Sequence, residues 1–527
     1  LFTDEGYYMH NARNVVLYHQ VKTDEFNNML LMPTLHYLQI AVFKVFGVGL
    51  AQTRAISVVF SLATLFVFWI ALNRAFDEQV ASIATLFLGL DHINLLYNRM
   101  GLMDTPAAFV MVCAFYALMR CFCYVDRDDA GKHTRRWAIG SGVLLGLVYA
   151  TRGLGAIMIP APFLAYWFLG REDYRLDTEK GRILGGILGG MCAVLLLYAL
   201  LWYLPNREAI RHANHYHLSF QLAPHSLAHL WRNISQALSG QKFLGLAPYL
   251  FRYSPIQFGL VLLFFAAYGF QKPMSHRAKF TIGVAGLWLL AGWLLFCVVN
   301  YAPSRYYVLV YPAMATLSAV SLVYFKDLWE VLLSRRLVRS LLAGFFTYQG
   351  ALLVWEWLHR APSSLPTVVA LCVLMGVFLL PTAPTYDHYA LRPLGSASMV
   401  LLLLWCAVNG GWYVDWWRNL RYTHIGASNW LGQNLPPNSV LIGDCAPGLC
   451  VTNRLRCVNV IPDLCNDKET LDRWKGSPIY IAILDGSAKE VWWLEHYPKA
   501  VANENRITLF APLVSHTVGV YRVDAVR

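Results

Sequence analysis

Charged residues are scarce in this chain of 527 residues. Asp, Glu, Lys and Arg together make up 14% of it, whereas soluble globular proteins carry roughly 25%. Hydrophobic residues make up 57%, so the composition argues against an ordinary soluble domain and favours a membrane protein. The net charge is +12, but Lys and Arg gather in short gaps between apolar runs, a distribution that argues against nucleic acid as the partner.

Several familiar signatures are missing as well. We find no heptad pattern, no low-complexity tract and no internal repeat. No Gly-rich phosphate loop follows a strand-like run, which argues against a nucleotide-binding site. Residue 1 is a Leu inside a motif, and we expect a first transmembrane helix to precede it.

Long apolar runs fill most of the first 412 residues. A span needs about 20 apolar residues, and on that scale we expect about twelve spans. They lie at 51–72, 79–97, 106–124, 137–149, 153–169, 183–203, 255–270, 280–299, 306–325, 339–357, 366–380 and 394–412. Residues 29–46 hold Pro and polar side chains, and we expect them to form a helix at the membrane interface. The predicted architecture is therefore a mainly α, polytopic membrane domain over 1–412, with outward loops at 1–50 and 204–254.

Alternate gaps between these runs are basic, which predicts the orientation. The basic gaps carry Arg127, Lys132, Arg135 and Arg136; Arg171, Arg175, Lys180 and Arg182; Lys272, Arg277 and Lys279; and Lys326, Arg335, Arg336 and Arg339. We expect that side to be the cytoplasm. The loop containing 99–104, residues 151–152, the 204–252 loop, residues 300–305 and the C-terminal tail then face outward with the first acidic residues.

The pattern of the sequence changes near residue 413, where the long apolar runs end. Buried strand-like runs at 439–443, 477–484 and 516–522 alternate with helix-like patterns at 468–475 and 488–497. This alternation predicts a small extracytoplasmic α/β domain over 413–527.

Eleven cysteines are present, seven of them in or beside apolar runs, where small core residues are expected. The other four are the outward Cys445, Cys450, Cys457 and Cys465. Their spacing does not match a zinc site, and in an oxidising compartment disulfides are the expected state, with buried thiols as the alternative. Four cysteines allow three pairings, which the sequence leaves open.

Acidic residues at the rim of the membrane domain are the main candidates for chemistry. Asp4 and Glu5 open the chain, and Asp104 stands before Thr-Pro at the start of a span. Acids at such positions are functional candidates, although Asp104 could equally act as a helix N-cap. Four cations face the same side, and guanidinium groups suit a phosphate or pyrophosphate, although an Arg at a rim can simply extend to lipid headgroups. These four are Arg54, Arg99, Arg152 and Arg305.

Histidines are dense in the 204–252 loop. His212, His215 and His217 form an array that could bind a divalent metal. The alternative is a lid helix with polar histidines, and no cofactor is fixed by the sequence.

Short motifs in the first 312 residues resemble those of the GT-C membrane glycosyltransferases. They are the outward Asp-Glu followed by Tyr and Ala-Arg, Pro-x-Leu-x-Tyr ahead of Phe-Gly, Arg-x4-Asp ending at Asp104, and Arg-Tyr-x4-Tyr-Pro at 305–312. The sequence is similar to the bacterial lipid A aminoarabinose transferases and the protein O-mannosyltransferases in particular.

The resemblance implies a transferase of the bacterial inner membrane that takes a hexosyl or pentosyl group from a polyprenyl-phosphate donor. Its acceptor would be a glycan, lipid or protein on the extracytoplasmic side. Asp4 matches the family's first-loop base, Glu5 and Asp104 its other acids, and Arg305 its donor-phosphate contact. We group Tyr306, Arg99, Arg152 and Arg54 with that phosphate contact, and Tyr7, His36, Tyr37 and His215 with the substrate loop.

One departure from the family stands out. The aminoarabinose transferases carry a Lys before their Pro-Pro-Leu, and here Met32-Pro33-Thr34-Leu35 has none. This motivates a second reading, a membrane subunit with the same architecture and no activity. A third reading, a transporter of lipid-linked substrates, would require broken helices with charges near the membrane midplane.

Overall fold

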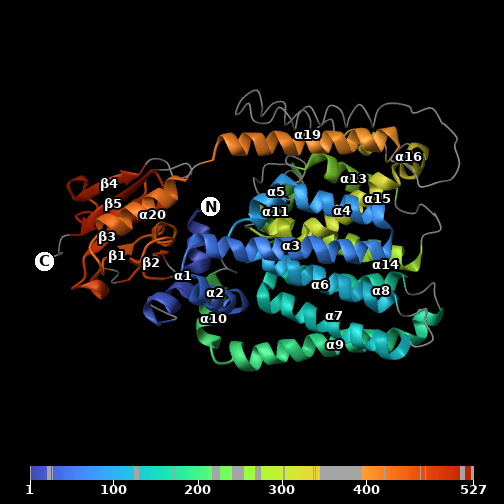
Figure 1. Ribbon diagram of the computed structural model, residues 1–527, viewed down its shortest axis with the longest axis horizontal. Coiled ribbons are helices and arrows are strands. Elements are labelled where there is room, and N and C mark those ends of the chain that lie inside the picture. Colours follow the sequence, from blue (N-terminus) through green and yellow to red (C-terminus); the bar gives the residue numbers. More distant parts are fainter. Residues whose placement is uncertain are drawn as a thin grey trace.

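The computed structural model contains a helical bundle with a small α/β domain at one end (Figure 1). It describes residues 2–20, 25–26, 28–31, 33–123, 130–169, 174–216, 226–239, 254–267, 275–300, 303–335, 338, 340–342, 344, 395–420, 422–462, 465–468, 471–510 and 517–523. Helix α19 (Ser396–Arg418) runs along the bundle and leads into the α/β domain. Chain ends far apart in sequence therefore meet at this end of the molecule.

The bundle follows the expected order of apolar runs. Its first half consists of α1 (Phe2–Tyr18), η1 (Asn28–Leu30), α2 (Pro33–Phe46), α3 (Leu50–Ala75), α4 (Glu78–Leu90), α5 (His92–Asn98), α6 (Asp104–Cys123), α7 (Ala130–Thr151), η2 (Gly153–Met158), α8 (Pro160–Leu169) and α9 (Tyr174–Tyr198). Its second half consists of the π-helical turn η3 (Ala199–Tyr203), α10 (Arg207–Tyr216), α11 (Leu227–Ser239), α13 (Pro255–Ala266), α14 (His276–Val298), η5 (Ser304–Leu309), α15 (Tyr311–Val323) and α16 (Phe325–Ser334).

Five helices in the described ranges are long and apolar enough to cross a membrane, and a sixth is counted if the bent pair α4–α5 is one span. Three further apolar helices are shorter, at Gly153–Ala165, Pro255–Ala266 and Tyr311–Val323. The membrane character predicted from composition is thus confirmed. The expected span at 366–380 and nearly all of the one at 339–357 lie outside the described residues.

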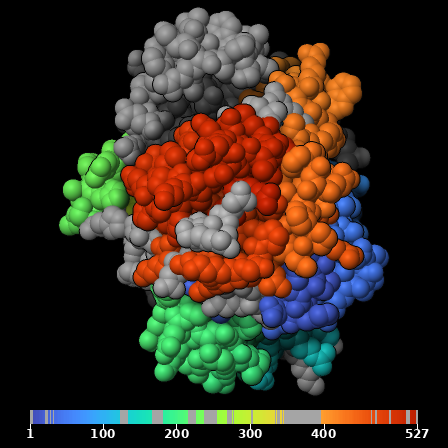
Figure 2. All heavy atoms as spheres, turned by 90° about the vertical axis from the view of Figure 1, so that its left-hand side faces the viewer, coloured from blue at the N-terminus to red at the C-terminus, as the bar shows by residue number. Residues whose placement is uncertain are grey.

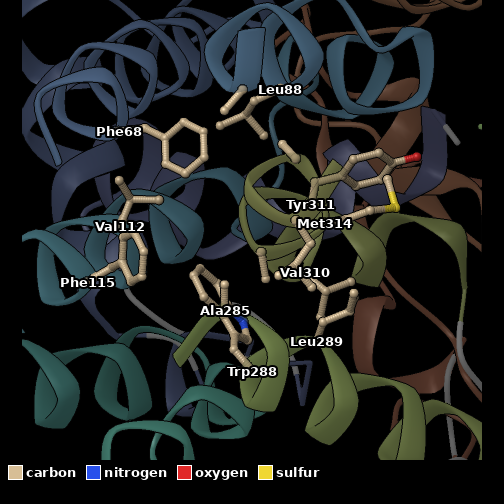
Figure 3. Packing of buried hydrophobic residues seen from close by; sticks show 14 of the residues in the cluster. Phe68, Leu88, Val112, Phe115, Ala285, Trp288, Leu289, Val310, Tyr311 and Met314 are labelled. Carbon is tan, nitrogen blue, oxygen red and sulfur yellow. The ribbon is translucent and has the colours of Figure 1, made fainter. Parts of the chain in front are cut away.

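The bundle core is built from side chains of the long helices. Phe68 of α3, Phe115 of α6, Trp288 of α14 and Tyr311 of α15 are almost completely buried, and Figure 3 shows them packed around Val112 and its neighbours. Each such side chain removes a large apolar surface from its surroundings and fills space at interior density. This core fixes the ends of the helices that carry the candidate site.

The helix expected at 79–97 is broken by a bend of 63° between α4 and α5. Asp91 caps the second half, since one carboxylate oxygen accepts from the Ile93 and Asn94 amides and the other from Ser254 Oγ. Both the backbone amide and the Nδ1 of His92 contact Asn409 Oδ1 on α19, at 2.7 and 2.9 Å. A buried bend in a helix is stable when the backbone N–H and C=O groups that lose their helical hydrogen bonds find other partners.

The α/β domain has one five-stranded sheet in the order β2-β1-β3-β5-β4. Its strands are β1 (Val440–Ile442), β2 (Arg456–Val458), β3 (Ile479–Leu484), β4 (Arg506–Phe510) and β5 (Val518–Val523). β1 pairs in parallel with β2 and β3, whereas β5 runs antiparallel to β3 and β4. Its helical elements in the described ranges are α20 (Thr423–Asn434), α21 (Ala446–Leu449), α22 (Ala488–His496), η7 (Asp472–Trp474) and η8 (Asn503–Asn505).

The three predicted strands are therefore present as β1, β3 and β5, and the helix predicted at 488–497 is present as α22. In the described part of the range 468–475 (468 and 471–475) the structure has the 3-10 turn η7, and Gly476 follows it with a φ of +100°. The sequence analysis missed β2 and β4.

Helix α1 packs directly against the α/β domain, and Figure 2 shows the blue N-terminal segment beside the orange and red domain. A Cβ on Gly6 would come within 2.3 Å of the Pro447 carbonyl carbon and 2.4 Å of the Gly448 nitrogen. The two backbones therefore approach more closely than any side chain at position 6 would permit.

We predict that Gly6→Ala weakens the docking of α1, because the added methyl group meets backbone rather than a flexible side chain. Overpacking typically costs about 1–3 kcal/mol, and the melting temperature of the purified protein should fall. Gly140→Ala is the matched control, since it also adds a methyl group within a helix but has open space around it. Equal melting temperatures for the two variants would contradict this account of α1.

Candidate active site

Asp4 of α1 and Arg305 of η5 form an ion pair between segments 301 positions apart. Arg305 Nη1 donates to Asp4 Oδ2. The Asp4 side chain keeps 21% of its surface exposed and the Arg305 side chain 11%. The pair thus lies at the edge of the bundle, where a bound molecule can reach the carboxylate.

A second pair lies deeper. Arg152, the residue before η2, places its Nε 2.9 Å from Oδ1 of Asp104, and both side chains are buried. The charges are close, but among the described residues neither carboxylate oxygen of Asp104 has a partner in hydrogen-bond geometry. Buried polar atoms in this condition are rare in native proteins and are costly unless something binds them.

Tyr306 connects the two pairs. The Arg152 guanidinium carbon lies 4.7 Å from the centre of the Tyr306 ring, and that of Arg305 lies 5.5 Å from it. The electron-rich ring face attracts both cations and holds them at one place. Asp4, Asp104, Arg152 and Arg305 are therefore gathered around one tyrosine, as a site for an anionic ligand requires.

The charge state of this cluster follows from its surroundings. Burial by itself would lower the pKa of the Arg305 guanidinium, but the acidic groups around it, Tyr8 and Asp4 foremost, raise that pKa well above its ordinary value. At neutral pH the site thus holds a cationic Arg305.

Glu5 has a different set of contacts from its neighbour Asp4. Its carboxylate accepts two hydrogen bonds from Arg54 of α3, at 2.9 and 2.7 Å, and one from the Gly101 amide at 2.8 Å. This forked arrangement fixes α1 to α3 and to the loop before α6. We expected Arg54 to bind the donor phosphate, but in the structure its guanidinium is paired with Glu5.

Arg99 contacts an aromatic ring of α19. Its guanidinium carbon is 3.7 Å from the centre of the Trp416 ring on α19. The contact joins the loop before α6 to the helix that leads into the α/β domain.

The structure puts the expected substrate-loop residues in several places. The Tyr7 hydroxyl donates to the Asp444 carbonyl of the α/β domain at 2.5 Å. His36 is buried in α2, and Tyr37 is exposed beside Trp202. The side chain of His215 lies outside the described residues.

The histidine array is only partly described. His212 is exposed on α10, whereas the His215 and His217 side chains lie outside the described residues. Within the described part of the chain, no group of three or more His, Cys, Asp or Glu side chains is arranged to hold a metal ion.

The four outward cysteines are buried thiols in the structure, so the expected disulfides are not formed in it. The Cys445 thiol donates to the Ala482 carbonyl at 3.4 Å and the Cys465 thiol to the Asn459 carbonyl at 3.6 Å. Cys457 Sγ lies 3.1 Å from His10 Nδ1 of α1.

Sequence reasoning missed two participants. Tyr8 is buried, with its ring centre 6.0 Å from the Arg305 guanidinium carbon. Ser304 shares a short hydrogen bond with Tyr97 of α5, which holds the start of η5. A signal for Tyr8 was available, because it follows Asp4 by four positions and lies on the same face of α1.

We predict that Arg152→Gln destabilises the fold by about 3–5 kcal/mol, because it leaves the Asp104 carboxylate buried without its counter-charge. Adding Asp104→Asn to that variant should recover much of the loss, since no uncompensated charge remains. Thermal unfolding of the two single variants and the double variant measures this coupling. Strictly additive losses would mean that the two charges do not interact.

The chain was compared with known proteins. Residues 31–217 match the model of the dolichyl-phosphate-mannose-protein mannosyltransferase family. No curated protein sequence matches the chain.

Among solved structures, apo ArnT from Cupriavidus metallidurans superposes with a TM-score of 0.58 at 17% identity, covering 99% of this chain and 93% of that one. The same protein bound to undecaprenyl phosphate gives 0.56 at 15% identity, covering 99% and 94%. The apo oligosaccharyltransferase of Archaeoglobus fulgidus gives 0.49 at 12% identity, covering 92% and 66%. The chain thus resembles the GT-C membrane glycosyltransferases, with the fold of ArnT over nearly its whole length and a mannosyltransferase-family match within residues 31–217.

Proposed function

We propose that this protein is an integral-membrane glycosyltransferase that moves a sugar from a polyprenyl-phosphate donor to an acceptor hydroxyl or amine. The observation that carries the proposal is the cluster in which Arg305 and Arg152 contact Tyr306 beside two carboxylates. The family match and the ArnT fold support the same reading.

The donor phosphate is held by the two guanidinium groups. Arg305 and Arg152 are fixed cations at one place, and guanidinium binds phosphate oxygens with two parallel hydrogen bonds. Preorganised cations also stabilise the charge that develops on a phosphate leaving group as the glycosidic bond breaks. They supply the positive charge that the family's Lys would bring and that Met32 cannot. In the ArnT structure the bound molecule is undecaprenyl phosphate, a ligand of this chemical class.

Asp4 acts as the general base. In the ligand-free arrangement its carboxylate is paired with Arg305. A phosphate that draws Arg305 toward itself leaves the partly exposed carboxylate ready to accept the proton of the acceptor. Proton removal by a positioned base typically contributes about 10²–10⁴-fold to the rate.

Asp104 is the second acid of the site. Within the part of the chain that the structure describes, its two buried oxygens lack hydrogen bonds, so a donor-sugar hydroxyl can donate to the carboxylate beside Arg152. The partner Arg152 holds this carboxylate in place.

The reaction takes place on the extracytoplasmic face of a bacterial inner membrane. The acid–arginine cluster lies at the same end of the bundle as the α/β domain, since Asp4 and Tyr7 are in one helix and Tyr7 bonds to Asp444. Helix α6 begins at this end and α7 returns to it, so the basic start of α7, with Lys132, Arg135 and Arg136, is at the opposite end. Basic connections favour the cytoplasmic side. The acceptor class, whether glycan, lipid or protein, is left open.

Two variants separate the roles of base and phosphate ligand. Asp4→Asn should retain binding of a short-chain polyprenyl phosphate and lower the transfer rate by about 10²–10⁴-fold, whereas Arg305→Gln should lose both binding and transfer. Tryptophan-fluorescence titration with the phosphate lipid and a radiolabelled sugar-transfer assay measure the two properties. Asp472→Asn, which alters an exposed acid of the α/β domain, is the control and should behave as wild type.

Normal transfer by a folded Asp4→Asn variant would remove the proposed base. A wild-type protein that binds the phosphate lipid but transfers no sugar from any polyprenyl-phosphate donor would favour a non-catalytic subunit. Movement of the lipid across vesicle membranes without transfer would favour a transporter instead.

A single displacement by the acceptor inverts the anomeric centre, because the acceptor attacks opposite the departing phosphate. We therefore expect the product linkage to have the anomeric configuration opposite to that of the donor. Proton NMR of the product gives the anomeric coupling constant, and retention of the donor configuration would contradict the single displacement.

A further inference from the structure

A short loop of the α/β domain receives helix α1. Arg13 donates through Nη2 to the carbonyls of Asn453 and Leu455, at 3.1 and 2.6 Å. The Tyr18 hydroxyl donates to the Arg454 carbonyl at 2.9 Å. Three consecutive carbonyls therefore bind two side chains of α1, and we call residues 450–457 the receiving loop.

Cysteines stand at both ends of the receiving loop. Cys450 follows α21 and Cys457 is the central residue of β2, and the two buried thiol side chains are in hydrogen-bond contact with each other. Cys457 Sγ also lies 3.1 Å from His10 Nδ1, whose other ring nitrogen contacts the Asn14 side chain at 3.2 Å. The thiol pair thus closes the base of the loop and touches α1 itself.

A buried cation accompanies this pair. The Arg13 side chain is almost fully buried, its Nε and Nη1 have no hydrogen-bond partner, and no ion pair to it is found in the described residues. Burial opposes ionisation of Cys450, but its contact with Cys457 and the Arg13 charge outweigh burial and lower the pKa of the Cys450 thiol. A guanidinium beside two adjacent thiols stabilises a thiolate, the form that reacts with disulfides.

The other two cysteines of the domain have different partners. Cys445 donates to the Ala482 carbonyl of β3, and Cys465 donates to the Asn459 carbonyl. Neither lies within the receiving loop. Of the four, Cys450 and Cys457 are the two that bracket the segment bound by α1.

We propose that Cys450 and Cys457 form a redox-convertible thiol pair, a modification site whose oxidation by a small-molecule or protein disulfide closes the receiving loop and holds α1 in place. This site is independent of the proposed sugar transfer, because neither thiol touches the acid–arginine cluster.

The oxidation is a two-step exchange with a disulfide R–S–S–R. The Cys450 thiolate attacks one sulfur and forms a mixed disulfide, releasing one RS⁻. The Cys457 thiol then loses its proton, with His10 as the nearest acceptor, and attacks the Cys450 sulfur to release the second RS⁻. Both leaving groups take up a proton, so two protein thiols are oxidised to one disulfide while one R–S–S–R is reduced to two RSH.

Peptide mapping tests the pairing in the full-length protein. The reduced protein in detergent is treated with oxidised glutathione, remaining thiols are alkylated, and the protein is digested with trypsin. Trypsin cuts after Arg454 and Arg456, which lie between the two cysteines. A disulfide-linked pair of peptides carrying Cys450 and Cys457 is expected in wild type and absent from Cys450→Ser. Cys445→Ser, the matched control for a buried thiol of the same domain, should still form it.

The consequence is tested by melting. Oxidised wild type should unfold at a temperature about 5 °C or more above the reduced protein, and this difference should vanish in Cys450→Ser and Cys457→Ser but remain in Cys445→Ser. The tryptic peptide 422–454 carries both Cys445 and Cys450, and the peptide 457–468 carries both Cys457 and Cys465, so the variants assign the link. A linked pair that persists in Cys450→Ser and disappears from Cys445→Ser, or glutathione adducts on Cys450 that never resolve onto Cys457, would overturn the proposal. So would a linked Cys450–Cys457 pair that leaves the melting temperature unchanged.

Discussion

Charge burial is the constraint on which this structure depends. Arg152 and Asp104 are both buried, and neither can be removed alone without leaving an uncompensated ion. Asp4 and Arg305 obey the same constraint near the surface. Because each ion has its partner on a different helix, the pairs fix the positions of α1, α6, η2 and η5 relative to one another. Burying these ion pairs costs free energy during folding. The same pairs also concentrate charge at one place, where an anionic ligand can bind.

Helix α1 is the element held most firmly by this scheme, because it is fastened on two sides. Toward the bundle, Glu5 accepts from Arg54 and from the Gly101 amide. Toward the α/β domain, Tyr7, Arg13 and Tyr18 donate to backbone carbonyls. Asp4 is left with one contact to Arg305 and part of its surface open. Asp4 therefore keeps part of its surface open although the helix that carries it is fastened on two sides. This arrangement orients a reactive carboxylate without burying it.

Much of this could be predicted from the sequence. Apolar run length predicted α3, α6, α9, α14 and α19, since a span has a fixed minimal length. The candidate acids Asp4 and Asp104 and the cation Arg305 were picked out because charged residues are conspicuous between apolar runs, and the structure does bring them together around Tyr306. The break at Asp91 was not predicted, because hydropathy averages over a single capped turn.

Other features depend on tertiary contacts that a linear pattern does not contain. Arg54 was expected at the phosphate, but Glu5 occupies it. Tyr7 was expected at the substrate, but its hydroxyl reaches a carbonyl 437 positions away. The strand β2 escaped notice because its three residues, Arg-Cys-Val, include a charged side chain and form no apolar run like that of β1. The sequence shows which charged residues need a partner, but it does not show which residue that partner is.

The sheet of the α/β domain has one further consequence. In open sheets with parallel strands, small ligands usually bind outside the carboxyl ends of the strands, where successive connections depart in opposite directions. Here β1 is that strand, with β2 on one side and β3 on the other, and its carboxyl end continues into Gly443 and Asp444. The Tyr7 hydroxyl donates to the carbonyl of Asp444, and Gly6 packs on helix α21, which follows. Helix α1 thus lies at the position where sheets of this kind usually bind a ligand. In this protein that position serves to attach the first helix to the α/β domain.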